Sequence, residues 1–160
     1  MIDDEPTGLT KEVYLAEKRK QALVVRSKPF TMLAKLHLSE IPLVGAAAFR
    51  TKKGEEAILI NWDQFESAFG QDFTDCVPFE IEHEAEELWL TRGKERVDSF
   101  GPDHYEAIRA AMKKADSEGK LDRYMELKRA QMKMFDAMGD THAMKELGFY
   151  SQVAEQLKEK

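Results

Sequence analysis

The sequence predicts an α+β fold, with a small antiparallel sheet in the N-terminal half and a mostly helical C-terminal half. Short apolar segments fill residues 30–62 and are separated by turn residues, which is typical of strands. Beyond residue 63 the segments are longer, begin at capping residues or prolines and end at glycines, which is typical of helices. With 160 residues, we expect residues 1–9 to form a disordered lead-in and residues 10–160 to form a single α+β domain.

The N-terminal half begins with a predicted helix that Thr10 caps and that runs to about Val25. Arg26 to Pro29 should end it, because the residue before a proline avoids helical geometry. Three strands are expected next, over Phe30–Leu38, Leu43–Arg50 and Glu56–Trp62. The last two are joined by Thr51–Gly54, which has the composition of a hairpin turn.

The C-terminal half is predicted to consist of helices that glycines terminate. A short helix follows Asp63, which has capping-box spacing to Glu66, and Gly70 should stop it. The longer helices are expected over residues 78–92, 102–118 and 121–138, with one or two more from residue 141 to the C-terminus around Gly148. Pro102 is well placed at a first helical position.

Charge is distributed unevenly along the chain. The formal net charge is -6, but the segment from Asp63 to Glu106 holds thirteen acidic and three basic residues, which is a local net charge of -10. Such a segment attracts cations and repels nucleic acid, so we expect no nucleic-acid partner. The simplest interpretation is a solvated acidic face.

Several functional classes are excluded by what the sequence contains. No apolar run approaches the roughly 20 residues that a membrane span needs, so no membrane association is expected. The N-terminus is acidic where a secretory signal would be basic, which favours a cytoplasmic location. The single cysteine, Cys76, excludes a multi-cysteine zinc site and is interpreted as a packed thiol. Nucleotide-dependent and serine-hydrolase functions lack their glycine-rich loop and nucleophile elbow.

The segment around His83 carries the most chemical information. On a helix, His83 and Glu87 are four residues apart and reach the same point outside one face. That spacing presents an imidazole nitrogen and a carboxylate oxygen to one zinc ion. The adjacent Glu84 is the candidate catalytic residue, a general base for a metal-bound water. A third metal ligand is expected from His104, at the start of the next long helix.

His83-Glu84-Ala85-Glu86-Glu87 resembles the His-Glu-x-x-His motif of the zincin-like metallohydrolases, with Glu87 at the place of the second histidine. The order of a strand ending near Trp62, this helix and a further helix bearing a histidine is also similar, over about residues 43–115. The resemblance implies a zinc-dependent hydrolase that acts on a peptide or amide bond. Glutamate at the second position keeps the ligand geometry but lowers the Lewis acidity of the ion.

Three alternatives stand beside the hydrolase. His83 could be a structural histidine bonded to a nearby carboxylate, or the cluster could bind metal without catalysis. The protein could also be a non-catalytic interaction module that presents its acidic centre, or the methionine-rich helix from Leu121 to Met138, to a protein or peptide partner.

Overall fold

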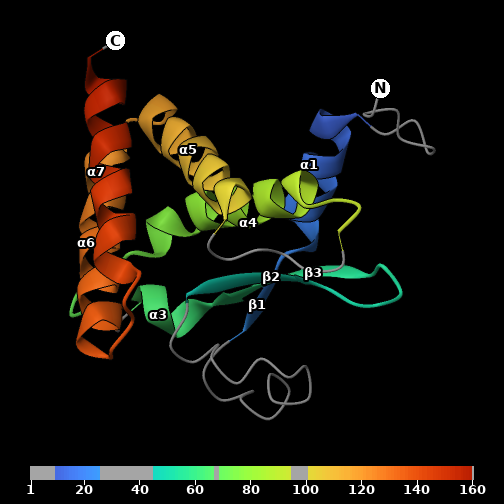
Figure 1. The fold of residues 1–160 in the computed structure, drawn as a ribbon, viewed down its shortest axis with the longest axis horizontal. Helices are drawn as coiled ribbons and strands as arrows, with labels where there is room; N and C mark the ends of the chain where they lie inside the picture. The colour runs from blue at the N-terminus through green and yellow to red at the C-terminus, as the bar shows by residue number, and fades with distance from the viewer. Residues whose placement is uncertain (1–9, 26–44, 67–68, 95–100, 160) are drawn as a thin grey trace.

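The computed structural model describes residues 10–25, 45–66, 69–94 and 101–159, and it confirms the α+β class. A small sheet is formed by the N-terminal half, and helices make up most of the rest (Figure 1). The elements, in chain order, are α1 (Lys11–Gln21), β1 (Leu23–Val25), β2 (Ala46–Arg50), β3 (Glu56–Asn61), α3 (Trp62–Glu66), the 3-10 turn η2 (Thr74–Cys76), α4 (Val77–Leu90), α5 (Pro102–Ser117), α6 (Leu121–Ala137) and α7 (Ala143–Lys158).

The sheet has the strand order β1-β3-β2 and is mixed rather than fully antiparallel. The predicted hairpin is confirmed: β2 and β3 are antiparallel, and the amide of Gly54 donates to the carbonyl of Thr51 at 2.9 Å across the turn. Gly54 has a φ of 87°, which a side chain would strain. The parallel pairing comes from β1, which aligns Leu23 with Leu59 of β3.

Strand β1 corrects the predicted length of the first helix. Thr10 caps α1 as expected, with its Oγ1 accepting from the amide of Val13 at 3.3 Å, but the helix ends at Gln21 rather than Val25. Adjacent β-branched residues favour a strand once a partner strand is available, and β3 is that partner. The predicted lead-in, the helix stop before Pro29 and the strand Phe30–Leu38 lie outside the described residues.

The predicted helices of the C-terminal half are confirmed to within a few residues at their ends. The first, α3, begins at Trp62 instead of Gln64, so the strand before it is one residue shorter than expected. Helices α4, α5 and α6 each end just before the predicted glycine, and Gly93, Gly119 and Gly139 all have positive φ. One continuous helix, α7, passes through Gly148.

Helix α4 occupies the centre of the molecule (Figure 1). The sheet lies on one side of it and α5 on the other, with α1 near its C-terminal end and the antiparallel pair α6 and α7 near its N-terminal end. Arg50 of β2 fastens α4 to the sheet, because its guanidinium donates to the carbonyl oxygens of Leu88 at 2.8 Å and Thr91 at 3.0 Å. A cation at this place satisfies the free carbonyls at the end of a helix.

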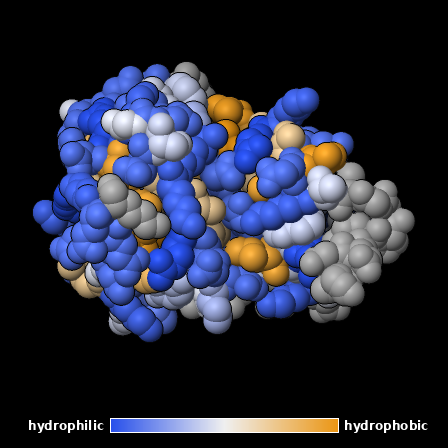
Figure 2. Space-filling view, turned by 90° about the horizontal axis from the view of Figure 1, so that it is seen from above, coloured by the Kyte–Doolittle hydropathy of each residue, from blue (hydrophilic) through white to orange (hydrophobic). Residues whose placement is uncertain are grey.

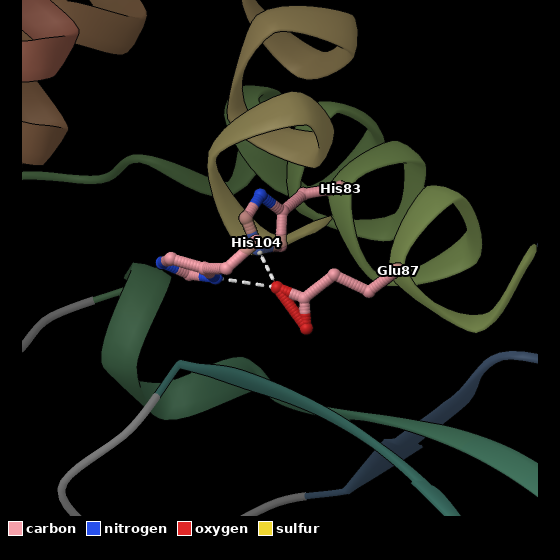
Figure 3. Close-up of side chains that lie close together, drawn as sticks. All are labelled: His83, Glu87 and His104. Carbon is pink, nitrogen blue, oxygen red and sulfur yellow. Dashed lines mark hydrogen bonds and ion pairs between the residues drawn. The ribbon is translucent and has the colours of Figure 1, made fainter. Parts of the chain in front are cut away.

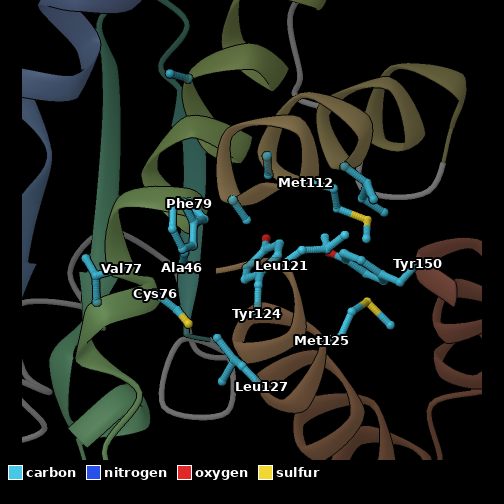
Figure 4. Packing of buried hydrophobic residues seen from close by; sticks show 14 of the residues in the cluster. Ala46, Cys76, Val77, Phe79, Met112, Leu121, Tyr124, Met125, Leu127 and Tyr150 are labelled. Carbon is cyan, nitrogen blue, oxygen red and sulfur yellow. The ribbon is translucent and has the colours of Figure 1, made fainter. Parts of the chain in front are cut away.

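The apolar core lies between α4, the helices around it and the inner side chains of β2 and β3 (Figure 4). Phe79 of α4 packs edge-on against Tyr124 of α6, with ring centroids 5.5 Å apart. Cys76 is fully buried here, and burial raises the pKa of its thiol to about 12, as expected for a packed thiol. Met125 and Met132 of the methionine-rich helix are also buried, so they serve packing.

The outer surface carries few large apolar side chains. Figure 2 shows one face on which hydrophilic residues predominate and hydrophobic residues occur in small separate groups. The exposed large hydrophobic residues in the described part of the chain are Val13, Leu23, Val24, Met138 and Met144. No helix in the described ranges is both long enough and apolar enough to span a membrane.

Candidate metal centre

Helix α4 is buried on nearly all sides, including its charged side chains. Five glutamates of this helix have 4–7% of their surface exposed: Glu80, Glu82, Glu84, Glu86 and Glu87. The interpretation of this segment as a solvated acidic face is therefore wrong for α4. Buried carboxylates are costly unless they are paired, so each one requires a partner.

Four of the five buried glutamates have a close partner of opposite charge or a hydrogen-bond donor. Arg19 of α1 makes two hydrogen bonds to Glu82, at 2.7 and 3.1 Å, and Lys11 contacts Glu86 at 3.0 Å. Glu80 lies 2.5 Å from the ammonium of Lys128 and accepts from the hydroxyl of Tyr124. The fourth, Glu87, is held by two histidines.

His83 and Glu87, whose spacing places them on one helical face, meet His104, the expected third ligand (Figure 3). Oε2 of Glu87 lies 2.6 Å from Nε2 of His83 and 2.5 Å from Nδ1 of His104. One turn of α4 places the first pair on a single face, and the first turn of α5 brings His104 to them. One ligand atom from each residue lies within 4.8 Å of the other two.

Binding of one metal ion would require these separations to change. Ligand atoms that are each about 2.1 Å from a zinc ion can be at most about 4.2 Å apart. In a tetrahedral site they are about 3.4 Å apart. The longest separation in the cluster, up to 4.8 Å, therefore has to shorten, and the 2.6 and 2.5 Å contacts of Glu87 have to lengthen, before all three atoms can ligate one ion. Two imidazoles and one carboxylate form a donor set that binds Zn²⁺, and the same set binds Fe²⁺.

The outer nitrogen atoms of the two histidines differ in their surroundings. Nε2 of His104 lies 2.8 Å from Oε1 of Glu146, in the first turn of α7. Nδ1 of His83 is buried and has no hydrogen-bond partner among the described residues. Among the described residues, the outer nitrogen of His104 is therefore the one that has a carboxylate to fix the orientation of its ring.

The protonation states of the cluster follow from its charges. Burial alone would raise the pKa of Glu87, but the two histidines that contact it lower that pKa well below its usual range. Burial, together with the negative charge of Glu87, raises the pKa of Glu84. Burial opposes protonation of His104, yet its hydrogen bonds to Glu146 and Glu87 raise its pKa to about 10. Glu87 therefore holds the negative charge, and Glu84 keeps its proton.

Glu84 lies beside the cluster without taking part in its short contacts. Its Oε2 is 3.8 Å from Nε2 of His83, and the residue is 7% exposed. His83 and Glu87 are equally enclosed, at 5% and 4%. The side chains of His104 and Glu146 are more accessible, at 12% and 14%, so solvent approaches the cluster from the side of α5 and α7.

The sequence indicated His83, Glu84, Glu87 and His104, and the structure brings all four together. Two neighbouring groups were missed, namely Glu146 and the pair of Lys128 with Glu80. Glu146 lies 42 residues after His104, and no local spacing connects the two. In the sequence, Lys128 looks like one of several surface cations along a helix. Its burial in the structure, at 4% exposure, is what distinguishes it from the others.

Comparisons of the chain with protein-family models, with curated proteins and with solved structures found no match.

Proposed function

We propose that the protein binds one divalent transition-metal ion, zinc in the first instance, through His83, Glu87 and His104. The observation that carries the proposal is the meeting of two imidazole nitrogens at one carboxylate oxygen, at 2.6 and 2.5 Å, in a buried position. A cation equidistant from both nitrogens would take the place of that oxygen, and the carboxylate would retract to become its third ligand. The hydrogen bond from His104 to Glu146 supports this, because metal-bound histidines usually donate their other N–H to a carboxylate.

We propose hydrolysis of a peptide or amide bond as the reaction that the ion serves. The supporting observation is Glu84, a buried carboxyl 3.8 Å from a ligand nitrogen, whose pKa is raised while that of Glu87 is lowered. Carboxyl groups whose pKa values are pushed apart in this way commonly divide the roles of acid and base. A bound dication would favour ionised Glu84, which could then accept a proton from a metal-bound water. Substrate would approach past His104 and Glu146, the more exposed members.

The interaction-module alternative has less support, because the acidic residues of α4 and the methionines Met125 and Met132 of α6 are buried. The two functions respond differently to a chelator. If the protein binds zinc, saturation at about 100 times the Kd stabilises the fold by about 2.7 kcal/mol, and chelation removes this gain. An interaction module that binds no metal keeps the same melting temperature with and without the chelator.

Metal binding is tested by dialysis against zinc followed by elemental analysis. We expect one ion per chain in the wild type and well under one in His83→Ala and His104→Ala. His142→Ala is the matched control, because His142 is exposed and lies at the start of α7, outside the cluster. Substoichiometric zinc in the wild type, or equal zinc in all four proteins, would rule out the site.

Hydrolysis is tested separately on the zinc-loaded protein with a library of peptide and amide substrates. Glu84→Gln should keep its zinc and lose turnover by at least about 100-fold, since a positioned base contributes roughly 10²–10⁴-fold. Full turnover in Glu84→Gln would exclude this residue as the base. No turnover by the wild type with any substrate would leave metal binding without the hydrolase.

A further inference from the structure

We infer that Glu146 is a positioning residue of the metal centre, so that helix α7 is part of the site. The inference rests on the proposed metal binding and extends it from α4 and α5 to a third helix. Glu146 does not contact the point where the ligands meet. It acts through His104, whose Nε2 lies 2.8 Å from its carboxylate.

The geometry on the two sides of the His104 ring gives Glu146 this role. Nδ1 faces Glu87 at 2.5 Å and Nε2 faces Glu146 at 2.8 Å, so the ring is held between two carboxylates. When a metal takes Nδ1, the single remaining proton of the neutral imidazole must be on Nε2, where Glu146 accepts it. The acceptor thus fixes both the tautomer and the orientation of the ring.

His83 has no corresponding support. Its Nδ1 is buried without a hydrogen-bond partner in the described ranges, so nothing there selects its ring orientation from outside the cluster. Of the two histidine rings, that of His104 is therefore the one that a hydrogen bond to a described residue outside the cluster orients.

Neighbouring aromatic residues keep α7 in register with α5 at this place. Tyr105, next to His104, packs edge-on against Phe149, with ring centroids 4.7 Å apart. Phe149 follows Glu146 by three residues and lies on the same side of α7. Two adjacent residues of α5 thus meet two residues on one face of α7, which places the Glu146 carboxylate at the ring nitrogen.

The test compares zinc affinity among variants of α7 in the full chain, measured by competition with a chelating dye. We expect Glu146→Leu to weaken zinc binding by about 10–100-fold and Glu146→Gln, which keeps an acceptor, by about 10-fold at most. Glu155→Leu is the matched control, because Glu155 is exposed on the same helix, and its zinc affinity should equal that of the wild type. If Glu146→Leu does not fold, Glu146→Ala, which also lacks an acceptor, takes its place: zinc binding weaker than that of the wild type by about 10-fold or more supports the inference, and unchanged binding overturns it.

A second readout separates positioning from a general loss of stability. In zinc-loaded wild type, the ¹⁵N NMR spectrum should show His104 bound through Nδ1 and protonated at Nε2. In Glu146→Leu we expect this tautomer signature to be lost or mixed, while Glu155→Leu keeps it. Wild type that binds no zinc would refute the proposed function itself. Wild type that binds zinc while Glu146→Leu keeps both its affinity and its signature would refute only the role of Glu146.

Discussion

Replacing Lys128 with methionine is expected to lower the free energy of unfolding by about 3–5 kcal/mol, because the carboxylate of Glu80 would stay buried without a counter-charge. The two residues are 4% and 5% exposed, and their charged atoms are 2.5 Å apart. The ammonium of Lys128 also lies 5.2 and 5.3 Å from the ring centroids of Tyr124 and Tyr150, so methionine, which keeps a side chain of similar length, removes the charge together with its contacts to both rings. Relative to a typical total stability of about 5–15 kcal/mol, the effect is large.

The assay is a double-mutant cycle with Glu80→Gln, measured by urea denaturation. The glutamine of this second variant is neutral and can still accept from the hydroxyl of Tyr124, so the double variant should be more stable than Lys128→Met alone. A coupling energy above about 1 kcal/mol is expected for groups in direct contact. A loss of stability below about 1 kcal/mol in Lys128→Met, or additive effects in the cycle, would contradict the claim that the ion pair stabilises these two buried charges.

Three further perturbations test other parts of the structure. Burial would raise the pKa of Glu56, but hydrogen bonds from α1 and β2 outweigh burial and lower it. The ionised Glu56 therefore stabilises the fold above the unfolded pKa of about 4.3, and this stabilisation is lost as the pH falls below that value towards the lower pKa of the folded state. Glu56→Gln should accordingly lose stability relative to the wild type at about pH 7 and lose less at about pH 3, and an equal loss at both values would contradict this. Gly45→Ala should destabilise the protein by about 1–3 kcal/mol, since the new Cβ would lie 2.7 Å from Cζ of the buried Phe65. Gly148→Ala, whose Cβ would meet nothing within 4 Å, should instead stabilise α7 by about 0.5–1 kcal/mol. Equal effects of the two variants on the midpoint of urea unfolding would refute the packing argument. Cys76 should react with a thiol reagent much faster in urea than in buffer, because its thiol is buried and its pKa is raised to about 12, and equal rates would show that it is accessible.

The helical half could be predicted from the sequence because its signals are local. Proline at the start of α5 and glycines after α4, α5 and α6 mark boundaries whose physical causes act within a few residues. Strand β1 could not be predicted in the same way. Leu23–Val25 directly follows a helix, and it becomes a strand through pairing with β3, which lies far along the chain.

The candidate site likewise has a part that local sequence spacing predicts and a part that depends on tertiary packing. His83 and Glu87 lie one turn apart, so helical geometry alone predicted that they would meet. The contribution of Glu146 depends on how α7 packs against α5, which spacing in the sequence does not encode. The charge pattern was misleading for the same reason. A run of glutamates is usually solvated, and its burial in α4 depends on cations that come from α1 and α6.

The central claim is that two imidazoles and one carboxylate, from α4 and α5, bind a single ion. X-ray absorption at the zinc edge of the zinc-loaded protein tests it most directly. We predict two histidine nitrogens at about 2.0–2.1 Å and carboxylate or water oxygen at about 2.0–2.2 Å in the wild type, and loss of this signal together with the bound zinc in His104→Ala. A spectrum with only oxygen ligands, or one that His104→Ala leaves unchanged, would contradict it.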